Sequence, residues 1–478
     1  LAYVQIDRVG DFTAGAGAVI YDGGAWPAEY NGDYFTTEPT INLIHHQRLT
    51  PKTTSYEAHK LPGREETEFI RSTDKWWRPI EVRTGPDGAM YVGDFYNQAV
   101  IHNDTRGPDH NKVNAAVRPD RDHYFGRIWR IQHKQAKKLE VPDLTKADPA
   151  QLTAALAHPN RAIRLTASRL LIEKGAPAAP IANLLQKGNA EAKIAALWTL
   201  SGLKSVSPEL LTAALADPDL TVRRNAAGVA EVSTASVQSE KQTAGLIGDP
   251  DATVRVTALR ALGSMEISDA AARQIIASWP KLDDDFQRSA AVGAASRNPA
   301  GSIAAAVASI TAKHGRLDIL INNAGVMHDE PGKRVSEQSL AIWRSTFDTN
   351  VFGVIAVTQA FLPLLHKSAA GRIVNLSSIL GSNTLHSIPG SPIYDFKVPA
   401  YNVSKTALNG WTVQLAYELR DSNIKVNAAH PGHVQTDMGG ANAPMAITDG
   451  AKTSVQLALL PADGPNGGYF HMGETLPW

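Results

Sequence analysis

A tyrosine and a lysine stand four residues apart near the carboxy-terminal end of the chain, in the run Ala-Tyr-Asn-Val-Ser-Lys that begins at Ala400. On a helix this spacing places the Tyr401 and Lys405 side chains on one face, one turn apart. A lysine ammonium beside a phenol favours the phenolate, so the pair predicts a Tyr401 pKa below its ordinary value of about 10. Such a tyrosine can serve as an acid and as a base near neutral pH.

The pair lies in a region where apolar segments of strand length alternate with longer helical segments. The expected strands are residues 317–322, 371–377, 424–429 and 468–471, and the expected helices are 302–314, 336–365, 399–420 and one that begins near residue 448. Strands joined by helical crossovers predict a parallel sheet with helices on both faces. Polar groups follow three of the strands, at Asn322-Asn-Ala-Gly325, Ser377-Ser378 and His430 to Asp437. Because open parallel sheets bind ligands at the carboxyl ends of their strands, we expect a site at that edge.

With these motifs in this order, residues 301–478 resemble the carboxy-terminal part of the short-chain dehydrogenase/reductase family. The resemblance rests on Asn322 to Gly325, Ser378, the Tyr401–Lys405 pair and the Pro431-Gly432 turn. It implies a Rossmann-like α/β parallel sheet. It also implies an NAD(P)-dependent oxidoreductase that acts on a small carbonyl compound or an alcohol.

The resemblance further implies a role for each matching residue. Tyr401 would exchange a proton with the substrate oxygen, Lys405 would lower its pKa and hold the nicotinamide ribose, and Ser378 would donate a hydrogen bond to the substrate carbonyl. Asn350 would hold a proton-relay water. The residues that would contact the cofactor are Asn323, Tyr401, Lys405, Val434 and Thr436.

Two longer segments receive an interpretation from the same resemblance. Residues 383–398 lengthen the connection between Ser378 and Tyr401, and we expect this insertion to lie over the substrate cleft. The helices at 336–365 and 399–420 correspond to the faces through which the family usually dimerises, which leaves a homodimer open.

The glycine-rich dinucleotide loop expected before Asn322 is missing from the sequence. Its place, near residues 240–255, carries a helical repeat. That loop holds the cofactor pyrophosphate through free backbone N–H groups, so NAD or NADP binding is expected to be weakened or lost. The strand at 317–322 would then lie at the edge of a truncated sheet. Because residues 296–306 join two helical textures without a polar linker, we interpret the chain as a chimeric fusion of two truncated genes.

An internal repeat occupies residues 139–300. Apolar-basic-x-x-Ala segments begin at residues 163, 192, 222, 254 and 286, and they are separated by 29, 30, 32 and 32 residues. Three follow a turn with proline, in which an acidic cap before the proline is expected to start the helix. These units resemble HEAT-type repeats, which stack into an α-solenoid and suggest a non-catalytic scaffold that binds a protein partner. We expect the recurring arginines to bond turn carbonyls or the adjacent aspartates.

Residues 1–132 have the short alternating runs of an all-β segment. One unit is a strand at 79–83, a turn at 84–88 and a returning strand at 89–94. The segment resembles the closing blades of a β-propeller related to quinoprotein sugar dehydrogenases, with material for only part of the ring. A quinone site containing His45, His46, Arg78 and Asp94 is one alternative, and structural roles for these residues are the other.

Composition limits the remaining classes of function. The 478 residues carry 47 basic and 47 acidic side chains and no cysteine, so we expect no nucleic acid partner, no disulfide and no metal site. The apolar run at 351–365 is interrupted and predicts a buried helix rather than a membrane span. Localisation is open: the reductase part suggests the cytoplasm, whereas the propeller part allows secretion or the periplasm. The expected fold is thus multidomain: a partial β-propeller (1–132), a HEAT-type α-solenoid (139–300) and a truncated Rossmann-like domain (301–478).

Overall fold

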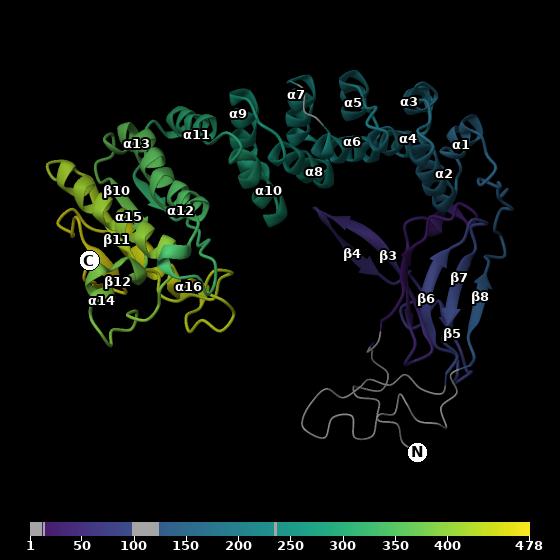
Figure 1. Ribbon diagram of the computed structural model, residues 1–478, viewed down its shortest axis with the longest axis horizontal. Helices are drawn as coiled ribbons and strands as arrows, with labels where there is room; N and C mark the ends of the chain where they lie inside the picture. Colours follow the sequence, from purple (N-terminus) through teal and green to yellow (C-terminus); the bar gives the residue numbers. More distant parts are fainter. Residues whose placement is uncertain (1–11, 13–14, 98–123, 234–236) are drawn as a thin grey trace, which may run out of the picture. The chain divides into compact units, whose positions relative to one another are not determined.

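The computed structural model describes residues 12, 15–97, 124–233 and 237–478, which fall into two compact units, 1–298 and 299–478 (Figure 1). Each unit has hydrophobic clusters of its own. The parts of the propeller-like prediction at residues 1–11, 13–14 and 98–123 lie outside the described residues.

Two antiparallel sheets open the first unit. The first contains β1 (Ala18–Ile20), β2 (Tyr34–Glu38), β3 (Leu43–Lys52) and β4 (Ser55–His59) in this order, with β5 (Ile70–Arg71) paired to β3. The second contains β6 (Pro79–Thr84), β7 (Met90–Asp94) and β8 (Arg127–Ile131). The predicted strand–turn–strand unit is confirmed as the β6–β7 hairpin. Its turn needs Gly88, whose φ is +74°, and the Tyr21 hydroxyl donates to the Gly88 carbonyl at 2.8 Å.

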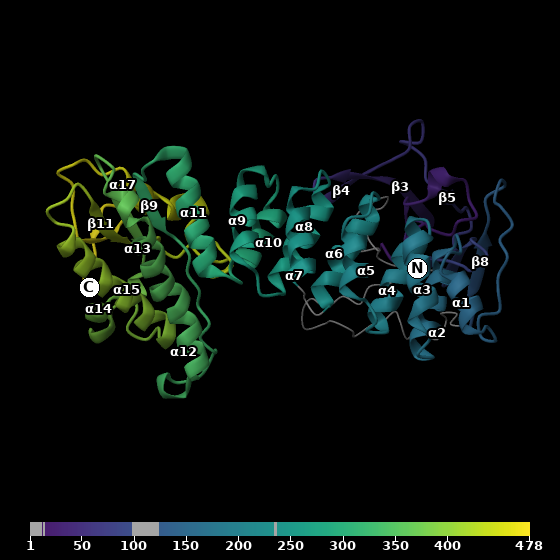
Figure 2. The ribbon, with the colours of Figure 1, turned by 90° about the horizontal axis from the view of Figure 1, so that it is seen from above.

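Helices follow from residue 149 to residue 295. They are α1 (Pro149–Ala155), α2 (Arg161–Glu173), α3 (Ala178–Lys187), α4 (Ala190–Gly202), α5 (Pro208–Leu215), α6 (Leu220–Val232), α7 (Val237–Gly245), α8 (Ala252–Gly263), α9 (Asp269–Ser278) and α10 (Asp285–Ala295). The even-numbered helices pack on one another in order, while α1 packs on α3, α5 on α7 and α7 on α9. The helices therefore lie in two rows (Figure 1; seen from above in Figure 2) around one continuous apolar cluster.

The repeated segments all begin in the first turn of an even-numbered helix. The caps differ from the prediction, because the residue after the proline, and not the acidic residue before it, accepts the first backbone N–H groups. Asp219 and Asp251 each accept two such bonds, and Asn160 accepts one. The proline thus ends the preceding turn, and the following short polar side chain starts the helix.

The recurring arginines confirm the structural interpretation. Arg223 donates from Nη1 to the carbonyls of Asp217 and Pro218, at 2.9 and 2.8 Å, and Arg255 repeats this pattern one unit later. Arg223 also pairs with the carboxylate of Asp249, 2.7 Å from Nε. Each arginine therefore ties its own turn to the turn of the next repeat.

The second unit is a five-stranded sheet with the order β13-β12-β11-β10-β9. Strands β9 (Ile319–Asn322), β10 (Arg372–Leu376), β11 (Lys425–Ala429) and β12 (Tyr469–His471) are parallel, and β13 (Glu474–Thr475) is antiparallel. The helical elements are α11 (Pro299–His314), α12 (Leu340–Phe347), the π-helix η6 (Asp348–Gly353), α13 (Val354–Leu365), α14 (Asn383–Ser387), α15 (Pro399–Glu418), α16 (Ile447–Gly450) and α17 (Lys452–Ala458).

Helices cover both faces of this sheet, as predicted. Ile373 packs with α13 and α15 residues on one face, whereas its neighbour Val374 packs with α17 residues on the other. The edge position of β9 is also as predicted, and Ile319 and Ile321 are exposed there. The sequence analysis missed β13 and α14, which are only 2 and 5 residues long.

One helical stretch of the described residues, Leu340–Leu365, is long and apolar enough to cross a membrane by length and composition alone. In this stretch, 33% of the most apolar window is buried. Leu365, at its end, belongs to the apolar cluster against the sheet.

Candidate active site

The residues predicted to do chemistry come from three elements of the second unit. Tyr401 and Lys405 lie on α15, Ser378 follows β10, and Asn350 lies in η6. All four side chains are at least 92% buried, with exposed fractions of 8, 3, 7 and 0% in that order. A hydrogen bond links the side chains of Tyr401 and Ser378, and Asn350 Nδ2 donates to Ser404 Oγ on α15 at 2.9 Å. The fold thus brings the four together.

The acidity of Tyr401 differs from the prediction. Burial raises the pKa of Tyr401 above its ordinary value of 10.0, and the hydrogen bond from Ser378 acts in the opposite direction. Lys405 Nζ lies 5.6 Å from the centre of the Tyr401 ring. The predicted low Tyr401 pKa is therefore wrong for this arrangement, because the loss of hydration outweighs the opposing effect of Ser378.

Lys405 is held by the main chain at the end of β10. Its Nζ donates to the Leu376 carbonyl at 2.7 Å, and burial lowers the pKa of Lys405 from 10.5 to about 8. Gly325 approaches from the loop after β9, where an added Cβ would lie 3.3 Å from Nζ and 3.5 Å from Asn350 Oδ1. A side chain at residue 325 would crowd both functional groups.

Asn350 fixes the loop after β9 to the helical layer. Its Oδ1 accepts from the Val326 N–H and its Nδ2 donates to the Val326 carbonyl, both at 2.8 Å. Together with the bond to Ser404, this uses both amide hydrogens and leaves one lone pair on Oδ1 for a further donor. Asn350 sits in a π-helix between α12 and α13, a distortion that is frequent at functional sites.

Ser378 is positioned by a second buried tyrosine that the sequence analysis missed. The Tyr469 hydroxyl donates to the Ser378 carbonyl, and Ser378 Oγ accepts from the Leu380 N–H at 3.3 Å. Burial raises the pKa of Tyr469, so its hydroxyl remains a donor. The Tyr469 ring stacks on Trp478, with 5.2 Å between centroids. No local sequence motif predicts the role of Tyr469, because that role depends on the pairing of β12 with β11.

His430 is another residue that was named only as part of a motif. Its Nδ1 accepts from the Ile379 and Gly432 N–H groups at 3.2 and 3.4 Å. Burial, assisted by His471 at a ring distance of 4.7 Å, lowers the pKa of His430 from 6.5 to about 3. The neutral ring therefore links the loop after β10 to the loop after β11.

The predicted cofactor contacts outside α15 lie after the edge strand β9 and after the central strand β11. Asn323 is exposed directly after β9. Thr436 is exposed in the loop after β11, where its N–H donates to the Val434 carbonyl at 2.8 Å and its Oγ1 accepts from Gly439. Gly432 opens this loop with a φ of +91°.

The residues present fit one end of a nicotinamide dinucleotide. Asn323 follows β9, and Val434 and Thr436 lie in the loop after β11, with exposed or half-buried groups; β10, whose last carbonyl accepts from Lys405, lies between these strands. Among the described residues of the second unit the sheet ends at β9, and the element before β9 is α11 rather than a strand with a glycine-rich turn. The pyrophosphate end therefore has no such cradle in this part of the chain.

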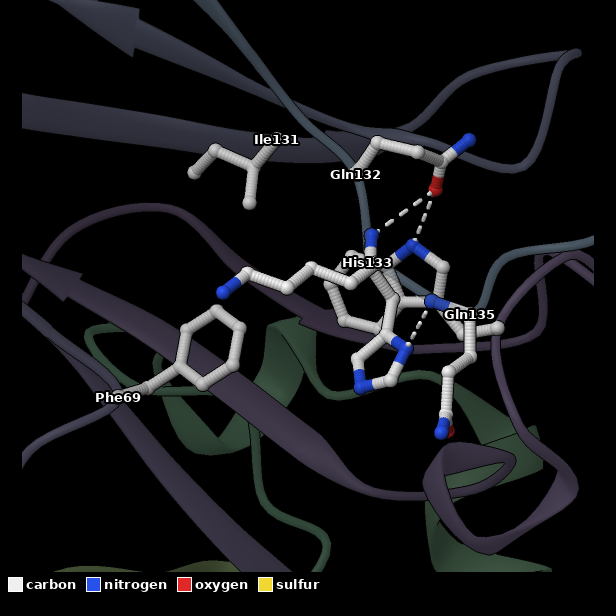
Figure 3. A pocket seen from close by; sticks show the side chains of 7 residues that line it. Phe69, Ile131, Gln132, His133 and Gln135 are labelled. Carbon is white, nitrogen blue, oxygen red and sulfur yellow. Dashed lines mark hydrogen bonds between the residues drawn. The ribbon is translucent and has the colours of Figure 1, made fainter.

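A pocket of about 470 Å³ lies in the other unit and shares no residue with this site. Its lining includes Trp26, Phe69 and His133 (Figure 3). Trp26 Nε1 donates to Gln132 Oε1 at 2.6 Å, and His133 Nδ1 accepts from the Gln135 N–H at 3.1 Å. These polar atoms are hydrogen-bonded to one another, and the seven predicted catalytic and cofactor-binding residues lie in the second unit.

Two families match the chain in separate regions. Residues 2–135 match a domain of unknown function, DUF7133, and residues 264–446 match the short chain dehydrogenase family. The first match includes both antiparallel sheets. The second includes all seven predicted site residues.

Individual relatives match the same carboxy-terminal region. Short-chain dehydrogenase anuI of Penicillium roqueforti is 38% identical over 162 residues, which cover 33% of this chain and 63% of that protein. Short-chain dehydrogenase/reductase 1 of Saponaria officinalis is 31% identical over 221 residues, covering 35% of this chain and 72% of the relative. The NADPH-bound carbonyl reductase from chicken fatty liver is 26% identical, covers 41% of this chain and 84% of that structure, and has a TM-score of 0.35. The chain thus spans less than two thirds of the Penicillium protein.

Proposed function

The chain belongs to the short-chain dehydrogenase/reductase family through its residues 264–446, and from this premise we propose that its site interconverts a small carbonyl compound and an alcohol with NAD or NADP. The observation that carries the proposal is the buried group of Tyr401, Ser378 and Lys405 at the carboxyl edge of a parallel sheet. Ligands of open α/β sheets bind at that edge.

In the carbonyl-to-alcohol direction, the site's own residues act on the substrate oxygen. Ser378 Oγ–H donates a hydrogen bond to the carbonyl oxygen, and Tyr401 Oη transfers its proton there as the C=O bond becomes a single bond. The raised Tyr401 pKa supports this direction, because the phenol keeps its proton at neutral pH until a more basic oxygen forms. The bound cofactor would supply the hydride for the carbonyl carbon.

Lys405 and Asn350 complete the proposed site. With a pKa of about 8, Lys405 is mostly protonated at pH 7, so its ammonium favours negative charge on the Tyr401 oxygen after transfer. We assign the nicotinamide ribose to Lys405, Tyr401 and Asn323, and the nicotinamide end to Val434 and Thr436. Asn350 offers its remaining Oδ1 lone pair to a water that returns the proton. Without a pyrophosphate cradle in the described residues, cofactor binding is expected to be weak.

Cofactor titration and turnover test this function directly. NADH or NADPH fluorescence is followed on adding the protein, and reduction of small aldehydes and ketones is followed by loss of the coenzyme signal. Tyr401→Phe is expected to reduce turnover roughly 100-fold or more while coenzyme binding persists. The matched control is Tyr417→Phe, since Tyr417 lies on the same helix and is 67% exposed. Failure of both coenzymes to bind at about 1 mM, a free energy weaker than roughly −4 kcal/mol, refutes the proposal for this chain.

For the other regions we propose a finer architecture than the family matches give. We infer that α1 to α10 form a HEAT-type solenoid, supported by the two helical rows and the repeated arginine–turn contacts. We infer that the two antiparallel sheets are blades of a partial β-propeller. The division at residues 132–139 and 300–301 is part of the same proposal.

A further inference from the structure

The amino terminus of α15 is capped by a side chain distant in sequence. The N-cap residue, Val398, has no side chain that can cap, and the first helical residue, Pro399, has no N–H. The next two N–H groups, of Ala400 and Tyr401, donate to Asp329 Oδ1 and Oδ2, at 2.8 and 3.0 Å. A carboxylate 71 residues upstream thus supplies the acceptors that a helix start needs.

This cap belongs to the loop that follows β9, and the loop is fixed on both sides of Asp329. On one side, the Asn350 amide makes two hydrogen bonds with Val326. On the other side, the Gln338 amide bonds both the N–H and the carbonyl of Glu330, at 3.1 and 3.0 Å. The carboxylate is therefore presented to α15 by a braced loop.

The bond to Asp329 acts on the residue that does the proposed chemistry. The N–H held by Oδ2 is that of Tyr401 itself, and Lys405 follows one turn later on the same helix. A negative charge is also favourable at the positive end of the helix dipole. Fixing this peptide sets the position of the Tyr401 hydroxyl relative to Ser378, which comes from a different element.

We propose that Asp329 is a positioning residue for Tyr401: its carboxylate accepts hydrogen bonds from the Ala400 and Tyr401 amides and so aligns the phenol with Ser378. This inference rests on the proposed function for its catalytic meaning. The two hydrogen bonds to Asp329 are a property of the folded chain that can be measured without turnover.

The test uses the full chain with Asp329→Ala and the neighbouring control Glu330→Ala. Glu330 is in the same loop, and its carboxylate pairs with Lys333 at the surface. Hydrogen exchange at the Ala400 and Tyr401 amides is expected to be roughly tenfold faster in Asp329→Ala, as for loss of a helix cap, and unchanged in the control. Unchanged exchange in Asp329→Ala would show that the Asp329 carboxylate does not hold these two amides, which overturns the proposal.

Two further readouts separate alignment from mere stability. The Tyr401 resonance in [13Cζ]tyrosine-labelled protein, assigned with Tyr401→Phe, is expected to shift in Asp329→Ala and not in Glu330→Ala. In turnover, kcat is expected to fall roughly tenfold with the coenzyme KM unchanged, and Asp329→Asn, which keeps one acceptor, is expected to recover part of the loss. A resonance that does not move overturns the proposal. An inactive wild type refutes the proposed function alone, since exchange and resonance still decide the role of Asp329.

Discussion

At the residue scale, burial favours the uncharged form of the titratable groups in the site, and the sequence alone does not predict this. Tyr401, Tyr469 and His430 all have pKa values shifted toward the uncharged form by burial. Lys405 is shifted in the same sense. The spacing of Tyr401 and Lys405 predicted their common helix and a close pair, but the sign of the Tyr401 shift depends on burial by elements distant in sequence that pack on α15, which local sequence does not contain.

His430 gives this neutral set a measurable pH dependence. Its pKa is lowered from 6.5 to about 3, so between these values the unfolded chain takes up a proton that the folded chain does not. Stability is therefore lost as pH falls from 6.5, by about 3 kcal/mol at pH 4. His430→Asn keeps an acceptor near Nδ1 and removes the titration. The melting temperature of this variant minus that of the wild type is therefore expected to increase as the pH is lowered from 7 to 4.

Thermal melts at the two pH values check this expectation, with His366→Asn as the control. His366 is exposed at the end of α13. The expectation fails if the control and His430→Asn follow the same pH trend.

At the element scale, locally coded features were predictable and features made by distant partners were not. The apolar runs gave β9, β10 and β11, and the repeat spacing gave the first turns of the even-numbered helices. The α15 start could be placed at Pro399, but its cap could not, because Asp329 lies 71 residues away. The cap position in the proline turns is a smaller miss: Pro218 and Pro250 are each flanked by two aspartates, both good caps, and backbone geometry decides between them.

The contacts between successive turns lead to a prediction for the helical rows. Arg223→Ala removes four hydrogen bonds and leaves Asp249, whose side chain is 4% exposed, without its cation. Loss of one partner of a buried pair is expected to cost about 3 kcal/mol. Denaturant unfolding of the first unit measures this cost.

Arg260→Ala is the matched control for that variant. Arg260 pairs with Glu231 across neighbouring even-numbered helices, but the two side chains are 60 and 28% exposed. An exposed pair is expected to contribute less than about 1 kcal/mol. Equal losses in the two variants would show that the turn-to-turn contacts do not stabilise the rows.

At the scale of the whole molecule, the compact units and the sequence families divide the chain at different places. The dehydrogenase match begins at residue 264, just after α8, whereas the second unit begins at Pro299. The residues before Pro299 are fixed to the first unit, since Asn298 Nδ2 donates to the Ile267 carbonyl and to Asp269. The connection from α10 to α11 is short and hydrogen-bonded, which agrees with the absence of a polar linker from the sequence of residues 296–306. The fusion of two truncated genes stays a hypothesis.

Separate hydrophobic clusters predict separate unfolding. Calorimetry of the full chain is expected to show two transitions, one for each unit. Arg223→Ala should lower only the transition of residues 1–298, and His430→Asn should affect only that of residues 299–478. The double variant should show both changes independently, because the two sites share no partners. A single transition that moves with either variant would contradict this division.

The π-helix at Asp348–Gly353 has a consequence for how this chain tolerates changes in length. A π-turn contains one residue more than the α-turn it replaces, and each residue advances an α-helix by about 100°. Loss of a single codon between 348 and 353 would thus yield a more regular helix, with better local hydrogen bonding, that rotates Asn350 away from Val326 and Ser404. The segment would gain regularity as a helix while the loop carrying Asp329 lost its anchor, so the length of this segment is constrained by the site rather than by the stability of the helix itself.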